Sequence, residues 1–142
     1  MTKTVQEFIE GRFADFMEIT LEEYRQGYCR AMFRIHPRYI NPLGSVHGGY
    51  LYTIADTAAG LAALHMGSRE TVATISGNMQ YLNAAIGCDR LRAEAIMVKD
   101  GKRVTFTEVS KEGEDGTVFA RGSFSFARLA LPHVATPPVS CR

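Results

Sequence analysis

The chain has 142 residues, of which 46% are hydrophobic and 22% charged, and this size and composition are ordinary for one globular domain. Its 16 Lys and Arg residues nearly balance 15 Asp and Glu residues, which gives a net charge of +1. The apolar content excludes intrinsic disorder, and the near-neutral charge argues against a dedicated nucleic-acid binder, whose domain is usually basic. We therefore expect a single domain over residues 1–142.

Apolar segments and cysteine usage indicate where in the cell the protein is located. No segment approaches the roughly 20 apolar residues that cross a bilayer, and Met1 to Glu10 lacks the apolar core of a signal peptide. Cys29, Cys88 and Cys141 are odd in number and form no Cys-x-x-Cys pair, and no His or Cys residues have metal-ligand spacing. We expect reduced thiols in the cytoplasm, no membrane partner, no metal and no other cofactor.

The first half of the chain alternates between helical and extended patterns. Apolar residues recur at helical spacing over 5–16, which predicts an N-terminal helix. Strict alternation over 17–24 and 28–35 predicts two strands joined as a hairpin. Prolines and a glycine predict a loop over 37–46, and the pattern is helical again over 47–66.

The second predicted helix is rich in Ala and Gly. Its apolar stripe comprises Leu51, Ile54, Ala55, Ala58, Leu61, Ala62 and His65. Ser45 is a candidate cap for its start, and Gly67 is a candidate stop. A helix with such small side chains is thin, so we expect it to pack tightly against a sheet.

The remainder of the chain is predicted to be strands with short turns between them. The expected strands span 72–82, 91–99, 103–111 and 117–126, and the tail over 129–142 is expected to be loose. Such short connections leave no room for crossover helices, so we expect four strands in an antiparallel meander. The predicted class is α+β, with a long helix against an antiparallel sheet.

The most unusual segment is the loop that leads into the long helix, from Asn41 to Gly49. The first N–H groups of a helix have no partners within it, and Gly48 and Gly49 leave them open to a ligand. Such N–H groups can stabilise a carbonyl oxygen as it becomes an oxyanion. Asn41 and His47 lie in the same loop, where they are candidates to orient substrate or water.

Asp56 is the second unusual residue, because it interrupts an apolar part of the helix. A buried carboxylate is costly unless it is paired or functional, so its candidate roles are pairing with hydrogen-bond donors of a neighbouring strand or catalysis as a general base. It follows His47 by nine residues, which places the two on roughly opposite sides of one helix. If both are catalytic, the simplest solution is a site shared between two copies of the chain.

The segment from Asn41 to Ala58 resembles the signature of hotdog-fold acyl-CoA thioesterases, most closely the phenylacetate-degradation (PaaI-like) group. The pattern is Asn-x-x-Gly-x-x-His-Gly-Gly with Asp nine residues after His, and the resemblance extends over about residues 17–128. It implies a sheet wrapped around the central helix. It also implies homodimers with two active sites at the subunit interface, often paired into tetramers.

The resemblance also implies roles for individual residues. Asp56 corresponds to the general base or nucleophile, and the N–H of Gly48 would polarise the thioester carbonyl. Asn41 and His47 would orient the carbonyl and the water from the partner subunit, and with Gly49 they would bind substrate. Thr74 stands where relatives have a Ser or Thr that positions the attacking water.

Two departures from the family pattern leave the acyl group open. Many relatives have an Asp at the position of Ser76, and many have a Pro soon after the Tyr81-Leu82 pair. We expect hydrolysis of an acyl-CoA thioester to the free acid and coenzyme A. Two alternatives remain: a non-catalytic acyl-CoA binding or sensing module, and, less in keeping with the spacing, a dehydratase acting on 3-hydroxyacyl thioesters.

Overall fold

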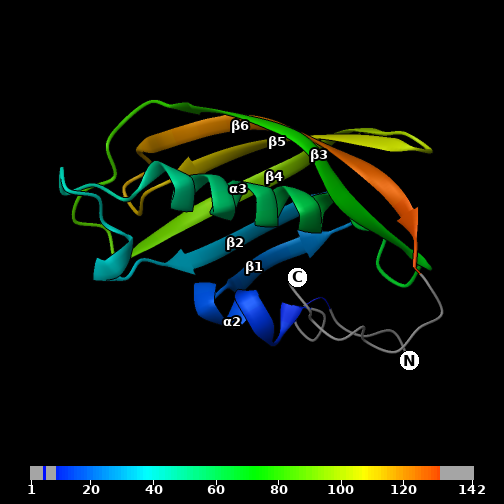
Figure 1. Cartoon of the computed structure of the whole chain (residues 1–142), viewed down its shortest axis with the longest axis horizontal. Coiled ribbons are helices and arrows are strands. Elements are labelled where there is room, and N and C mark those ends of the chain that lie inside the picture. The colour runs from blue at the N-terminus through cyan, green and yellow to red at the C-terminus, as the bar shows by residue number, and fades with distance from the viewer. Residues whose placement is uncertain (1–4, 6–8, 132–142) are drawn as a thin grey trace, which may run out of the picture.

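One antiparallel sheet of six strands curves around the long helix α3 (Figure 1). The computed structural model describes residue 5 and residues 9–131. The elements in chain order are α2 (Arg12–Met17), β1 (Thr20–Arg25), β2 (Tyr28–Arg34), the short 3-10 helix η1 (Pro37–Tyr39), α3 (Gly48–Ala63), β3 (Glu70–Tyr81), β4 (Arg90–Asp100), β5 (Val104–Glu112) and β6 (Val118–Ala130). The expected α+β class, with a helix laid against an antiparallel sheet, is confirmed.

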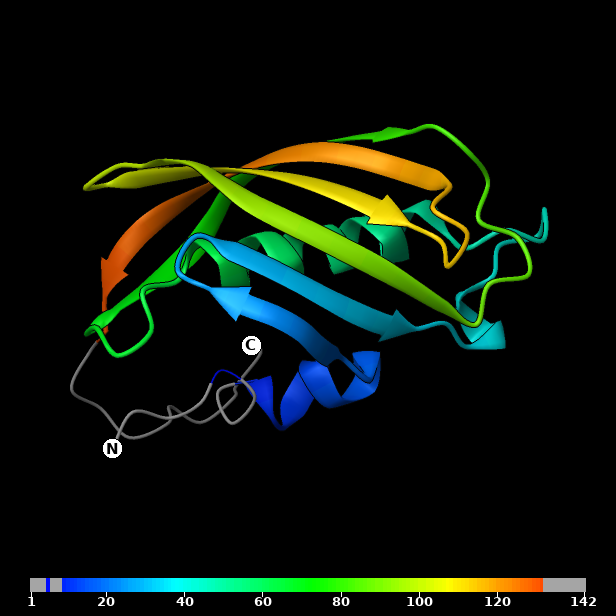
Figure 2. The same cartoon turned by 180° about the vertical axis from the view of Figure 1, so that it is seen from behind.

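The strand order is β1-β2-β4-β5-β6-β3, so the predicted meander of four strands is wrong in one respect. β4, β5 and β6 do follow one another, but β3 pairs with β6 and forms an edge of the sheet (Figure 2). The connection from β3 to β4 is not a hairpin, because its backbone bonds elsewhere: Leu82 N–H donates to Phe119 C=O (2.8 Å), and Ala85 C=O accepts from Val46 N–H (2.9 Å). This leaves one long side of β3 without a neighbouring strand.

The central helix α3 packs its small residues against the sheet. Its predicted stripe is buried from Leu51 to Ala62, whereas His65 lies beyond the end of the helix. The cap is His47 rather than Ser45, and the helix ends at Ala63, well before Gly67. Among the described residues, no helix has the length and apolar character needed to span a membrane.

The N-terminal region departs from the predicted single helix over 5–16. Gly11 has a φ of +88° and caps α2, which begins at Arg12, and residues 6–8 lie outside the described residues. The strand predicted from residue 17 begins only at Thr20, because Met17 ends α2 and Glu18 adopts a left-handed conformation (φ 46°). At the other end β6 continues to Ala130, and the rest of the predicted tail, residues 132–142, lies outside the described range.

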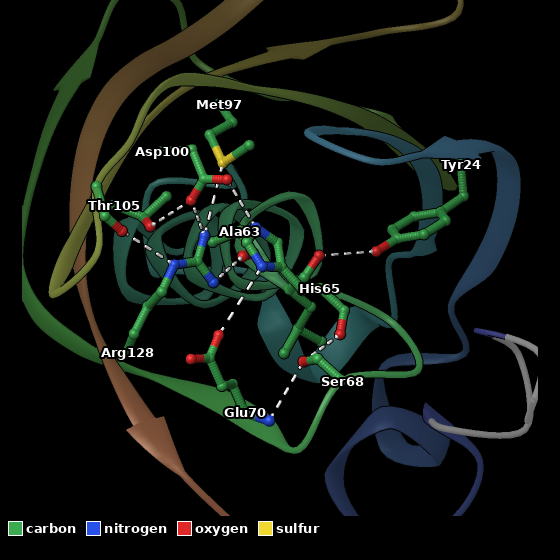
Figure 3. A network of polar contacts seen from close by, with 11 residues as sticks. Tyr24, Ala63, His65, Ser68, Glu70, Met97, Asp100, Thr105 and Arg128 are labelled. Atoms are coloured by element: carbon green, nitrogen blue, oxygen red, sulfur yellow. Dashed lines mark hydrogen bonds and ion pairs between the residues drawn. The ribbon is translucent and has the colours of Figure 1, made fainter.

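A polar network fastens the C-terminal end of α3 to the sheet (Figure 3). The nearly buried Arg128 donates to Ala63 C=O at the helix end (3.1 Å) and pairs with Asp100 of β4. His65 Nε2 lies 2.7 Å from the other oxygen of Asp100. Although burial raises the pKa of Asp100, hydrogen bonds from Arg128 and His65 bring it below its ordinary value. His65 is therefore a polar anchor for the end of the helix.

Candidate active site

The candidate site follows a seam where one face of α3 meets the edge strand β3. Residues four apart on a helix share a face, and three such residues each meet a residue of β3. The contacts are Gly48 with Tyr81, Tyr52 with Gly77, and Asp56 with Thr74. In the first contact a glycine of the helix faces a tyrosine of the strand. In the second, a tyrosine of the helix faces a glycine of the strand. The predicted base and the predicted oxyanion donor thus lie on one line.

Asp56 of α3 and Thr74 of β3, two of the predicted site residues, are in direct contact. Thr74 Oγ1 donates to Asp56 Oδ1 at 2.7 Å, and the Asp56 carboxylate is half-buried in the protomer. A β-bulge between Thr74 and Ser76 interrupts the register of β3 with β6. Ser76 instead bonds Ser125 of β6 (2.9 Å). The bulge therefore separates Thr74, which meets the helix, from the position where many relatives carry an Asp.

At the helix start, the two glycine N–H groups differ in availability. The N–H of Gly49 donates to His47 Nδ1 (2.8 Å), so His47 serves as the helix cap. The N–H of Gly48 makes no hydrogen bond with any of the described residues. The His47 carbonyl in the same peptide group accepts from Tyr50 (2.9 Å) and Leu51 (3.1 Å). Of the two glycines, Gly48 is the one with an N–H group open to a ligand.

Asn41 shapes the loop before the helix. Its Oδ1 accepts from the N–H groups of Leu43 (2.9 Å) and Ser45 (3.1 Å), and its Nδ2 donates to Ser45 Oγ (2.9 Å). These bonds form a compact turn around the side chain. Within one protomer the Asn41 amide therefore supports the loop, and its expected role toward a substrate carbonyl falls to its remaining Nδ2 hydrogen.

A cavity of about 330 Å³ lies beside the open N–H of Gly48. Its lining includes Asn41, Leu51, Tyr81 and Leu82. Asp56 is not part of this lining, because it is eight residues along α3 from Gly48, about 12 Å at the rise of an α-helix. The open N–H of Gly48 and the carboxylate of Asp56 therefore lie at opposite ends of the seam within one protomer.

Sequence reasoning missed both tyrosines of the seam. Tyr81 donates from its hydroxyl to the carbonyl of Gly48 (2.9 Å), and burial, with the nearby Tyr52, raises the pKa of Tyr81. The sequence could have indicated Tyr52 as a site residue, because it precedes Asp56 by four residues and so shares its face of the predicted helix. It could not have indicated Tyr81, since the contact of Tyr81 depends on where β3 lies in the sheet. Across residues 9–131, no cluster of three or more His, Cys, Asp and Glu side chains is suited to hold a metal ion.

An antiparallel sheet wrapped around one long central helix is the architecture of the hotdog fold. The model of the thioesterase superfamily matches residues 43–120, more than half of the chain, and the chain belongs to this superfamily. A candidate esterase of Halobacterium salinarum is 34% identical over 113 residues, which are 75% of this chain and 74% of that protein.

Solved structures show the same fold. A thioesterase from Haemophilus influenzae superposes with a TM-score of 0.82 at 18% identity, over 94% of this chain and 96% of that chain. The PaaI protein from the phenylacetic acid degradation operon of E. coli gives a TM-score of 0.80 at 18% identity, over 89% and 90%. A hypothetical thioesterase of Streptococcus pneumoniae with coenzyme A gives 0.73 at 23% identity, over 80% and 87%. The hotdog fold and the likeness to PaaI are therefore confirmed.

Proposed function

We propose that the protein hydrolyses an acyl-CoA thioester to a free acid and coenzyme A. The observation that carries the proposal is the hydrogen-bonded Asp56–Thr74 pair on the same helix face as the open N–H of Gly48. A carboxylate can serve as general base or nucleophile, and a free helix N-terminal N–H can stabilise an oxyanion. The coenzyme A present in the Streptococcus pneumoniae structure supports this choice of thioester.

The proposed water route uses two half-sites, the Asp56–Thr74 pair and the open N–H of Gly48. The Thr74 hydroxyl donates to Asp56, so its oxygen is free to accept a hydrogen bond from the attacking water. Asp56 takes a proton from that water as its oxygen bonds to the carbonyl carbon, and the oxyanion accepts a hydrogen bond from Gly48 N–H. The C–S bond then breaks, and the proton passes to the sulfur of coenzyme A. Direct attack by Asp56 on the carbonyl is the alternative within the same site.

We propose that the two half-sites meet across a homodimer. β3 is a 12-residue edge strand with unpaired backbone groups on its outer side, and Ile75 on it is 56% exposed. A second copy that pairs antiparallel along this edge would bring its own α3 beside the first, pointing the opposite way. Each Asp56 would then face the partner's Gly48, with His47 and Asn41 of the partner nearby.

A second surface supports pairing of two dimers. Ile96, Val98 and Phe106 are 45–59% exposed on neighbouring strands β4 and β5. Adjacent exposed apolar side chains of this kind are typical of protein contacts. We propose that this face joins two dimers into a tetramer. The free thiols of Cys29 and Cys88 fit the proposed cytoplasmic setting, and Cys141 lies outside the described residues.

The test of the reaction is the substitution Asp56→Asn, which keeps the shape of the side chain and removes the base. We expect kcat to fall about 10²- to 10⁴-fold with the dimer intact, measured as thiol release from a panel of acyl-CoA thioesters. Near-wild-type turnover by a folded Asp56→Asn dimer would contradict the assignment. Tight acyl-CoA binding by the wild type without product would favour a binding module, and an enoyl product would favour a dehydratase.

A further inference from the structure

Tyr52 occupies the middle of the seam between α3 and β3, where the strand makes room for it. A Cβ atom on Gly77 would lie 2.3 Å from the Tyr52 hydroxyl oxygen and 2.4 Å from Phe124, so no larger residue fits there without movement. The Tyr52 ring is tilted against Phe124, with 5.2 Å between ring centroids. The Tyr52 phenol therefore lies against β3 at Gly77, the position where the strand has no side chain.

The hydroxyl of Tyr52 makes no hydrogen bond with any of the described residues. The contrast with its neighbour is clear, because the Tyr81 hydroxyl donates to Gly48 C=O at 2.9 Å. Tyr52 is half-buried, and a phenylalanine would pack against Phe124 equally well. Among the described residues the Tyr52 hydroxyl is not a buried unpartnered group, so it keeps solvent access and is available to hydrogen-bond a ligand that enters the seam.

The position of Tyr52 indicates which part of a substrate would supply that group. Tyr52 precedes Asp56 by four residues on the same helix face, where Cβ atoms are about 5–6 Å apart. The Tyr52 hydroxyl lies at Gly77 and the Asp56 carboxylate at Thr74, three residues away on the same strand. A thioester carbonyl held for attack beside Asp56 therefore has the phenol within about 10 Å along the seam. The acyl atoms next to that carbonyl, carbons 2 and 3, are the nearest ones that can carry a hydrogen-bonding substituent.

We infer that Tyr52 is a specificity-determining residue that selects acyl-CoA thioesters with a hydroxyl or keto oxygen on carbon 2 or 3. Its hydroxyl hydrogen-bonds that oxygen, and its ring, held by Phe124 and Gly77, fixes the direction of the bond. This inference rests on the proposed thioester hydrolysis and names the acyl class that the same site prefers.

The experiment compares 3-hydroxybutanoyl-CoA with butanoyl-CoA, a pair that differs by one oxygen atom, in the wild type and in Tyr52→Phe. We expect the wild type to prefer the hydroxylated substrate in kcat/KM. Tyr52→Phe should lower that preference about tenfold or more, because a site that bonds a substrate hydroxyl discriminates strongly for it. The value for butanoyl-CoA should change less than about threefold.

Tyr50→Phe is the matched control, since it removes a phenol oxygen from the opposite side of α3, where Tyr50 bonds Arg34 C=O (3.3 Å). It should leave the substrate preference unchanged. An equal loss on both substrates in Tyr52→Phe, or dissociation of its dimer in size-exclusion chromatography, would overturn the inference in favour of a structural role. Hydrolysis with an unchanged preference would overturn the inference alone, whereas no hydrolysis of any acyl-CoA by the wild type would contradict the proposed function as well.

Discussion

The amine of Lys111 lies in the core, on the buried face of β5 that also carries Thr107 and Val109. Lys111 is fully buried, its Nζ is 4.0 Å from Met79 Sδ, and no carboxylate in residues 9–131 pairs with it. Burial lowers the pKa of Lys111 from 10.5 to about 7. Between about pH 7 and 10.5 the unfolded chain therefore holds a proton that the folded chain lacks, so stability should increase as pH rises.

This pH dependence is testable with Lys111→Met, which keeps a long side chain and removes the amine. The wild type should gain up to about 1 kcal/mol of unfolding free energy per pH unit between pH 7.5 and 9.5 relative to Lys111→Met, measured by urea denaturation. The variant should also be the more stable protein at pH 7. Lys99→Met, at an exposed position of β4, is the control and should run parallel to the wild type. Parallel profiles for Lys111→Met would contradict a buried neutral amine.

At the scale of elements, substitution by alanine should change the stability of the fold in opposite directions at two glycines, one on β3 and one on α3. A Cβ at Gly77 of β3 would clash with Tyr52 and Phe124, so Gly77→Ala should destabilise the fold by about 1–3 kcal/mol. A Cβ at Gly60 of α3 would lie 3.6 Å from Phe126, an ordinary contact, so Gly60→Ala should stabilise it by about 0.5–1 kcal/mol. Thermal unfolding of both variants measures the two changes in stability. A stabilising Gly77→Ala would contradict the close contact of Gly77 with Tyr52 and Phe124.

The sequence predicts elements better than it predicts their neighbours. Local periodicity gives β2 and β4 to within a residue or two, because alternation depends on side chains close in the chain. Local periodicity does not predict the helix break at Gly11 or the position of β3 beside β6. Within the site, the resemblance singles out Asp56 and Thr74, but the hydrogen bond between them is seen only in the structure. The contact of Tyr81 with Gly48 depends on long-range pairing of an edge strand, which no local pattern encodes.

At the scale of the whole molecule, the two ends of the seam can be disabled separately. Gly48 is the first residue of α3, where proline is tolerated, and the φ of −57° and ψ of 132° at the preceding His47 suit a proline next in the chain. Gly48→Pro therefore removes the open N–H with little strain. Gly48→Ala keeps that N–H and adds a Cβ 3.4 Å from the Tyr81 ring, an ordinary contact, so it is the matched control.

Mixed dimers then decide whether each site draws on two subunits. Asp56→Asn and Gly48→Pro should each be nearly inactive alone, but a mixed dimer would contain one site with both groups intact and one with neither. Random assortment of equal amounts gives half mixed dimers, so co-refolded protein should recover about a quarter of wild-type thioesterase activity. Recovery is expected because the intact Asp56 and the intact Gly48 then lie on different chains. If each protomer held a complete site, mixing two inactive chains would restore nothing, and the shared-site proposal would be wrong.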